Sequence, residues 1–135
     1  MKRTWAGLIA AAGLAVAALA TAGPGEHHVR VPLEAENGSH VSGWVNVVAM
    51  HSGGTKVMIQ AEGLEANTTY TSFFYESEDC SAPADKLVTF TTGADGRVTA
   101  RGETDEDLDE IGTISIRLGA DYGDLRACAA LHPKQ

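Results

Sequence analysis

Cys80 and Cys128 are the only cysteines of this 135-residue chain, and their thiols could form a structural disulfide or a redox-active pair. In an oxidising compartment, two cysteines without competitors can pair within the chain in one way only. A redox-active pair usually has close spacing, such as Cys-x-x-Cys, or a site that stabilises a thiolate, and neither pattern surrounds these residues. We therefore predict a structural bridge between the middle of the chain and its last strand.

A carboxylate-rich run, ETDEDLDE, could bind a hard cation such as calcium. Asp105, Asp107 and Asp109 have the i, i+2, i+4 spacing of the first ligands of an EF-hand loop. The sixth position, where that loop needs glycine, is Glu110, and the twelfth is Ile116 instead of glutamate. The EF-hand is therefore excluded. Two hypotheses remain, a solvated loop between strands and a looser extracellular calcium site.

Aromatic side chains crowd one predicted strand, which contains Tyr70, Phe73, Phe74 and Tyr75. Because successive residues of a strand point to opposite faces, both faces of this strand carry aromatic rings. Either the strand is central and both faces are buried beneath the disulfide, or one face is a possible aromatic binding platform.

The sequence contains no recognisable catalytic arrangement. It has no G-x-S-x-G motif and no Walker loop, and its five histidines form neither H-x-H nor H-E-x-x-H spacing. We therefore expect no enzymatic activity and no cofactor, apart from the calcium hypothesis.

Short strands must position these residues. Apolar residues recur at every second position, as in Ile114, Ile116 and Leu118, which predicts one buried and one solvated face for each strand. Turn-forming glycine and asparagine residues separate the runs, and only 103–111 could hold a helical turn. Eight short strands separated by turns predict an all-β fold, an antiparallel Greek-key sandwich or a flattened barrel. The predicted strands are 29–36, 42–50, 56–62, 70–76, 87–92, 97–102, 113–118 and 125–131.

The first 22 residues have the pattern of a removable export signal. Lys2 and Arg3 precede an uncharged, alanine-rich run that ends in the small-x-small cleavage site Ala20-Thr21-Ala22. The run is shorter and less apolar than a membrane-spanning helix requires. We predict a secreted or periplasmic protein with no membrane span after signal removal. The predicted parts are a signal peptide over 1–22, a flexible leader over 23–28 and one domain over 29–135.

The chain is acidic, with a formal net charge of −8 at pH 7. Removal of the signal would remove two basic residues and no acid, and so would make the charge more negative. Nucleic acids and anionic membranes repel such a protein. We expect no nucleic-acid partner, and the sequence leaves the partner as an unidentified protein or small molecule.

Several short motifs resemble those of the copper/zinc superoxide dismutase family. They are Gly63-Leu64, Asp79-Cys80-Ser81, Ala94-Asp95-Gly96 and Arg126-Ala127-Cys128-Ala129. The resemblance extends over residues 42–131. It implies a sandwich of the immunoglobulin/superoxide dismutase type with a disulfide between Cys80 and Cys128.

The metal-binding positions of that family do not hold histidine in this chain. Phe73 and Tyr75, with Phe74 between them, occupy the His-x-His positions, and Leu118 occupies a later copper-histidine position. Copper needs several imidazoles that converge on one point. The resemblance therefore implies the scaffold without dismutase activity.

The segment from Gly63 to Tyr70 also resembles the corner of fibronectin type III domains, in which a tyrosine hydroxyl ties down a corner of the sandwich. Chordin-type repeat domains have a similar strand pattern. All three resemblances imply a Greek-key sandwich.

Together these observations predict a non-catalytic β-sandwich protein that acts as a binding or structural module of the envelope or exterior. The first alternative is a copper- or zinc-binding protein derived from the superoxide dismutase scaffold. The second alternative is a calcium-dependent adhesion module.

Overall fold

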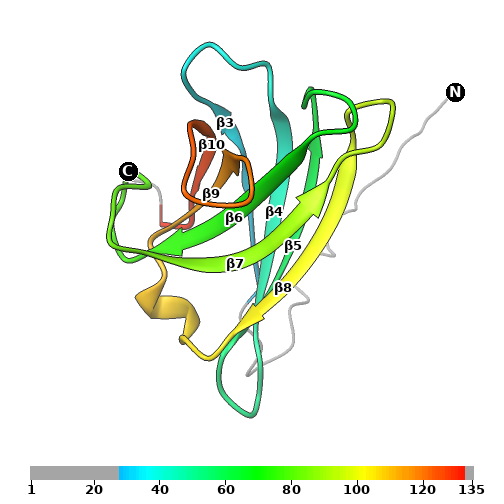
Figure 1. Ribbon diagram of the computed structural model, residues 1–135. Coiled ribbons are helices and arrows are strands. Elements are labelled where there is room, and N and C mark those ends of the chain that lie inside the picture. The colour runs from blue at the N-terminus through cyan, green and yellow to red at the C-terminus, as the bar shows by residue number, and fades with distance from the viewer. Residues whose placement is uncertain (1–27, 133–135) are drawn as a thin grey trace, which may run out of the picture.

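The computed structural model describes residues 28–132, which form two antiparallel β-sheets packed as a sandwich (Figure 1). The predicted signal peptide, the predicted leader up to residue 27 and the last three residues lie outside the described residues. The all-β sandwich that the alternating pattern predicts is confirmed. Its elements are β2 (His28–Pro32), β3 (Glu34–Ala35), β4 (Ser42–Ala49), β5 (Thr55–Glu62), β6 (Thr69–Tyr75), β7 (Ala84–Thr91), β8 (Val98–Thr104), the 3-10 helix η3 (Leu108–Glu110), β9 (Thr113–Leu118) and β10 (Leu125–Ala130).

The two sheets interleave along the chain. One sheet has five strands in the order β3-β10-β9-β6-β7, and the other has four in the order β2-β4-β5-β8. The chain therefore changes sheet on entering and on leaving β3, and again between β5 and β6, between β7 and β8, and between β8 and β9. The aromatic strand β6 lies inside its sheet, with β9 on one side and β7 on the other. Such a position allows both of its faces to be covered.

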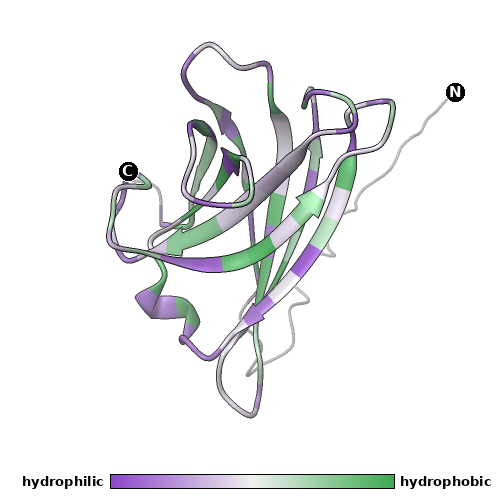
Figure 2. Ribbon diagram, viewed as in Figure 1, coloured by the Kyte–Doolittle hydropathy of each residue, from purple (hydrophilic) through white to green (hydrophobic). Residues whose placement is uncertain are grey.

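The core lies between the two sheets and follows from the period-two pattern. Val45, Val47 and Ile59 of the four-stranded sheet are buried against Ile114 and Ile116 of the five-stranded sheet in one cluster. Figure 2 shows hydrophobic stretches on the strands, with hydrophilic residues in the loops and also within β7 and β8. Burial of these branched side chains supplies the main driving force for the fold.

A tyrosine fixes the corner at which the chain passes from β5 to β6. The buried Tyr70 hydroxyl accepts a hydrogen bond of 2.9 Å from the backbone N–H of Glu65. This contact spans the crossing between sheets, as in the tyrosine corners of other sandwiches.

The structure corrects two predicted strands and the end of the predicted leader. The predicted strand 29–36 is two strands in different sheets, because the buried Leu33 separates β2 from β3 as the chain crosses over. His28, predicted as leader, belongs to β2 and pairs with Val48. The strand predicted at 87–92 already begins at Ala84, where exposed edge residues hide the alternation.

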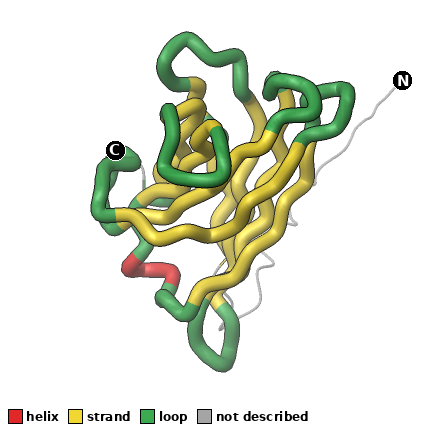
Figure 3. Tube along the Cα trace, in the orientation of Figure 1, coloured by secondary structure: helices red, strands yellow, loops and turns green. Residues whose placement is uncertain are grey.

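The acidic run contains the predicted helical turn. It is the 3-10 helix Leu108–Glu110, drawn red in Figure 3, and the buried Leu108 anchors it to the core. Among residues 28–132, no helix is long and apolar enough to cross a membrane.

Candidate functional site

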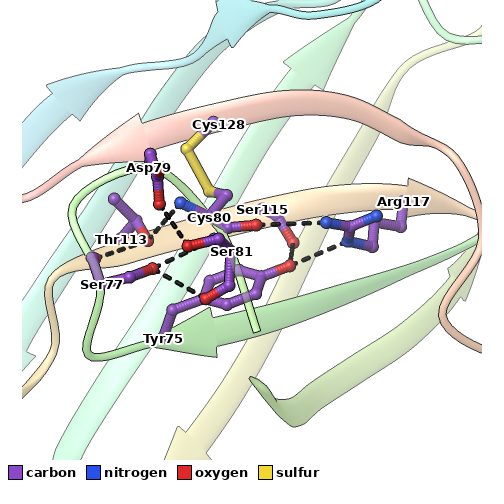
Figure 4. Close-up of a disulfide and its surroundings, with 9 residues drawn as sticks. All are labelled: Tyr75, Ser77, Asp79, Cys80, Ser81, Thr113, Ser115, Arg117 and Cys128. Atoms are coloured by element: carbon purple, nitrogen blue, oxygen red, sulfur yellow. Dashed lines mark hydrogen bonds between the residues drawn. A yellow bond between two sulfur atoms is a disulfide. The ribbon is translucent and has the colours of Figure 1, made fainter. Parts of the chain in front are cut away.

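The predicted disulfide is present on the outer face of the five-stranded sheet. Cys80, in the loop after β6, is bonded to Cys128 of β10 with a Cα–Cα distance of 6.1 Å (Figure 4). Both residues are buried, at 1% and 8% exposure. The backbone N–H of Cys80 also donates to Thr113 Oγ1 at 3.1 Å. The bridge and this bond hold the loop over β9 and β10.

Arg117 of β9 connects the same face to the loops that cover it. Its Nε donates to the Tyr75 hydroxyl at 2.9 Å, and its terminal nitrogens donate to the carbonyls of Cys80 at 3.1 Å and Gly123 at 2.9 Å. The Tyr75 hydroxyl is also 2.7 Å from Ser115 Oγ. The guanidinium is therefore occupied by internal acceptors, as Figure 4 shows for two of them.

Tyr122 lies over this network. The Arg117 Cζ is 3.8 Å from its ring centroid, and the Phe73 ring packs against it edge to face at 5.0 Å. Partial burial and a hydrogen bond with Tyr75 raise the pKa of the Tyr122 hydroxyl, and the nearby Arg117 charge opposes that shift. Tyr122 is thus part of the structural cover, although 44% of it is exposed.

The four aromatic residues of the predicted platform are all buried. Tyr70 and Phe74 join the core between the sheets, whereas Phe73 and Tyr75 pack with the disulfide on the opposite face of β6. They therefore do not form an exposed surface. The central position of β6 and the loops above it explain why both faces are covered. The water-facing side predicted for β9 is likewise buried, including Thr113 and Ser115.

The residues at the resembling metal positions do not converge on one point. Phe73 and Tyr75 lie on the disulfide side of the five-stranded sheet, whereas Leu118 packs against the core on the other side. Leu118 faces Tyr70 in the register of β9 and β6. Within residues 28–132, no group of three or more His, Cys, Asp or Glu side chains could hold a metal ion.

The three aspartates of the calcium hypothesis are exposed, and they do not all line the same hollow. Asp107 Oδ1 accepts a hydrogen bond from the Gly54 N–H at 3.4 Å, and Asp107 and Asp109 line a shared hollow of about 360 Å³. Asp105 does not line this hollow. Asp109 also borders a second hollow whose other acidic residues include Glu76 and Glu110.

The outer face of the four-stranded sheet has a different character. Val45, Val47 and Ile59 point inward, so the alternate residues of the same strands point outward. The strand register sets these outward residues in three cross-strand rows. The rows are Pro32, Trp44, Gln60 and Thr99; Arg30, Asn46, Met58 and Arg101; and His28, Val48, Lys56 and Glu103.

Trp44 and Arg30 form the most distinctive pair on this face. Trp44 is 42% exposed, and the Arg30 guanidinium carbon lies 4.4 Å from the centroid of its ring. Tryptophan combines a large apolar ring with a polar N–H and is enriched at binding interfaces. Within residues 28–132, the Arg30 side chain makes no hydrogen bond or ion pair, in contrast to Arg117.

Two hollows lie along this face. One, of about 830 Å³, is lined by Trp44, Gln60 and Gly43 among others, and another, of about 600 Å³, by Asn46, Met58 and neighbours. Gly43 has φ +137°, and a Cβ there would lie 2.0 Å from the Gln60 carbonyl oxygen, so only glycine fits. In the described part of the chain, the amides of Asn46 and Gln60 have no hydrogen-bond partner.

Sequence reasoning did not single out this face, although one signal was present. Trp44 stands at an outward position of a strand whose alternate residues are valine.

Comparison of the sequence with protein-family models gives no match, and no curated protein matches it either. The likeness to superoxide dismutases therefore remains one of short motifs, and function must be inferred from the geometry of the chain itself.

Proposed function

We propose that the protein is a non-catalytic binding module that works outside the cytoplasm, with its ligand on the outer face of the four-stranded sheet. The observation that carries this proposal is the exposed Trp44, flanked by polar side chains that no residue within 28–132 satisfies. Binding sites combine such an apolar ring with a few free polar groups.

Location outside the cytoplasm is supported by two independent features. The disulfide Cys80–Cys128 is of a kind that persists in oxidising compartments. The first 22 residues have the pattern of an export signal, which predicts secretion or a periplasmic location.

The scaffold fits a superoxide-dismutase-like sandwich in which the positions that resemble the metal ligands of that family contribute to packing instead. Phe73 and Tyr75 fill the resembling positions with apolar packing and a hydrogen-bonded hydroxyl. The proposal therefore places binding on the other sheet.

The test is retention of the protein by defined envelope and matrix polymers. Electrophoresis through gels that contain xylan, hydroxyethyl cellulose, alginate or polygalacturonate is combined with co-sedimentation on purified peptidoglycan. We expect at least one polymer to retain the protein and Trp44→Ala to abolish retention. Tyr122→Ala is the matched control, because Tyr122, in the loop that covers the other sheet, is exposed to nearly the same extent and carries its own stacked arginine.

Three outcomes would contradict the proposal. The first is retention that Trp44→Ala leaves unchanged, and the second is no retention by any of the five polymers. The third is stoichiometric copper or zinc in the purified protein, which would favour the metal-binding alternative. Calcium is tested separately, as a rise in melting temperature that Asp105→Asn with Asp107→Asn removes.

A further inference from the structure

Arg30 and Trp44 form a preorganised group for an anion. The guanidinium is stacked on the indole at 4.4 Å, which restricts its orientation. Stacking uses the plane of the guanidinium and leaves the N–H donors at its edge free, and no acceptor within residues 28–132 takes them. A guanidinium with a free edge binds carboxylate through two parallel hydrogen bonds.

Arg101 places a second cation at the far end of the same row. The row runs from Arg30 through Asn46 and Met58 to Arg101. Three strand spacings separate the two arginines, which corresponds to about 14 Å between their backbones. Within residues 28–132, Arg101 also has no ion-pair partner, whereas Arg97 at the corner of the sheet lies 3.7 Å from Glu62.

These two arginines share one face in a chain with a net charge of −8. Arg97 is paired with a carboxylate and Arg117 is occupied by internal acceptors, whereas the side chain of Arg126, on β10 of the other sheet, also makes no hydrogen bond or ion pair within residues 28–132. The face therefore fits a ligand that carries negative charges spaced along its length, not one concentrated charge. The hollows along the face are lined by Glu62, Asp95 and Glu103 as well as by Trp44 and Met58, so a ligand chain would place uncharged sugar rings there and its carboxylates beside Arg30 and Arg101.

We propose that this face binds a linear polysaccharide that carries carboxylate groups. The inference rests on the proposed function and specifies its ligand. Sugar rings lie over Trp44 and Met58, carboxylates pair with Arg30 and Arg101, and the amide of Asn46 hydrogen-bonds to hydroxyl groups. A sugar ring suits this mixture because it has apolar faces and a polar rim, as the sheet surface has.

Other polyanions fit the face less well. Single-stranded nucleic acid is bound mainly by stacking successive bases on several aromatic side chains, whereas the outward rows of this face contain one, Trp44; the acidic remainder of the molecule opposes nucleic acid as it opposes any polyanion. An extended acidic peptide gains much of its affinity by pairing with a sheet edge, whereas the free donors here lie on the face of the sheet. Both are therefore included as competitors in the test.

The experiment measures binding of polygalacturonate by the full chain with Trp5→Phe, which leaves Trp44 as the sole tryptophan. The matched ligand is the same polymer with its carboxylates methyl-esterified. Tryptophan fluorescence and calorimetry report the dissociation constant. We expect Arg30→Met and Arg101→Met each to raise it about tenfold, since each removes a charged hydrogen-bonding partner. Arg30→Lys restores only part of the loss, because the charge is kept without the planar fork.

Lys86→Met is the control for diffuse charge, because Lys86 is an exposed cation on β7 of the other sheet. We expect it to change the dissociation constant less than twofold. Equal weakening by this variant and by the arginine variants would overturn the inference. So would equal binding of the esterified polymer, or equally tight, arginine-dependent binding of polyglutamate or single-stranded DNA.

Failure of the inference and failure of the proposed function give different results. Retention by a neutral polymer that depends on Trp44 but not on Arg30 or Arg101 overturns the carboxylate assignment and leaves a binding module. Absence of Trp44-dependent binding to every polymer overturns both. Circular dichroism and melting curves of each variant show that the losses do not arise from unfolding.

Discussion

An exposed aromatic ring with an arginine stacked on it lies over the outer face of each sheet, and the two pairs have different roles. Tyr122 and Trp44 are exposed to nearly the same extent, at 44% and 42%. Arg117 lies 3.8 Å from the first ring and Arg30 lies 4.4 Å from the second. Arg117 donates to three internal acceptors, whereas Arg30 has none within residues 28–132.

The difference shows that exposure alone does not distinguish a binding residue from a structural one. On the five-stranded sheet, the disulfide loop and the loop after β9 fold back over the strands. Their backbone groups form hydrogen bonds with the polar side chains beneath them. On the four-stranded sheet, the outward side chains keep their hydrogen-bonding capacity. Free polar capacity beside an exposed ring is therefore the better indicator of a site.

The largest expected effect is loss of the bridge that closes the covered face. Replacing Cys80 and Cys128 together by alanine frees a long loop in the unfolded chain. We expect the free energy of unfolding to fall by about 4 kcal/mol, measured by denaturant titration. Trp44→Ala, on the open face, removes the stack with Arg30 and a half-exposed ring, and is expected to lower it by about 1 kcal/mol. Similar losses in the two variants would break the comparison.

The two arginines provide the sharpest test of the comparison. Arg117→Met leaves the Tyr75 hydroxyl and two carbonyl groups without their donor, and should cost about 3 kcal/mol. Arg30→Met removes only an exposed stack and should cost less than about 1 kcal/mol. Thermal and chemical unfolding of both variants measure the difference, and equal costs would show that Arg30 is also structural.

A smaller contrast is expected between single polar groups on the two faces. Tyr75→Phe removes a buried hydroxyl that contacts Ser115 and Arg117, and should lower the free energy of unfolding by about 1.5 kcal/mol. Asn46→Ala removes an amide without a partner in the described chain and should be close to neutral. A marked loss in the second variant would reveal an interaction on the open face.

The smallest effect concerns the acidic end of the molecule and depends on pH. Partial desolvation, followed by the charges of Glu110 and Glu76, raises the pKa of the Glu106 carboxyl. The folded chain then holds this proton more tightly than the unfolded chain, so stability falls as pH rises through the range above about pH 4. Glu106→Gln should therefore stabilise the protein slightly at pH 7 and have no effect below that range. Glu34→Gln on β3 is the control, and melting curves at several pH values check both.

The fold was largely predictable because it depends on local alternation. Most strands follow the period-two pattern, and two cysteines leave one pairing within the chain. The site was less accessible, because the pattern assigns Arg117 and Trp44 alike to the polar side of a strand. Only the three-dimensional path of the loops decides which of these sides is covered. For the same reason, the sequence could not show that both faces of β6 are buried.

The first and last described strands meet, since Val29 and His132 line the same hollow. Trp44 pairs with Pro32, which lies three residues beyond Val29 on β2, about 10 Å further along the sheet. A surface attached to the chain at His28 or at His132 would therefore hold the molecule at the end of the sandwich that is farther from Trp44. The indole would be carried on the half of the molecule that points away from that surface, where a long polymer could approach it without obstruction.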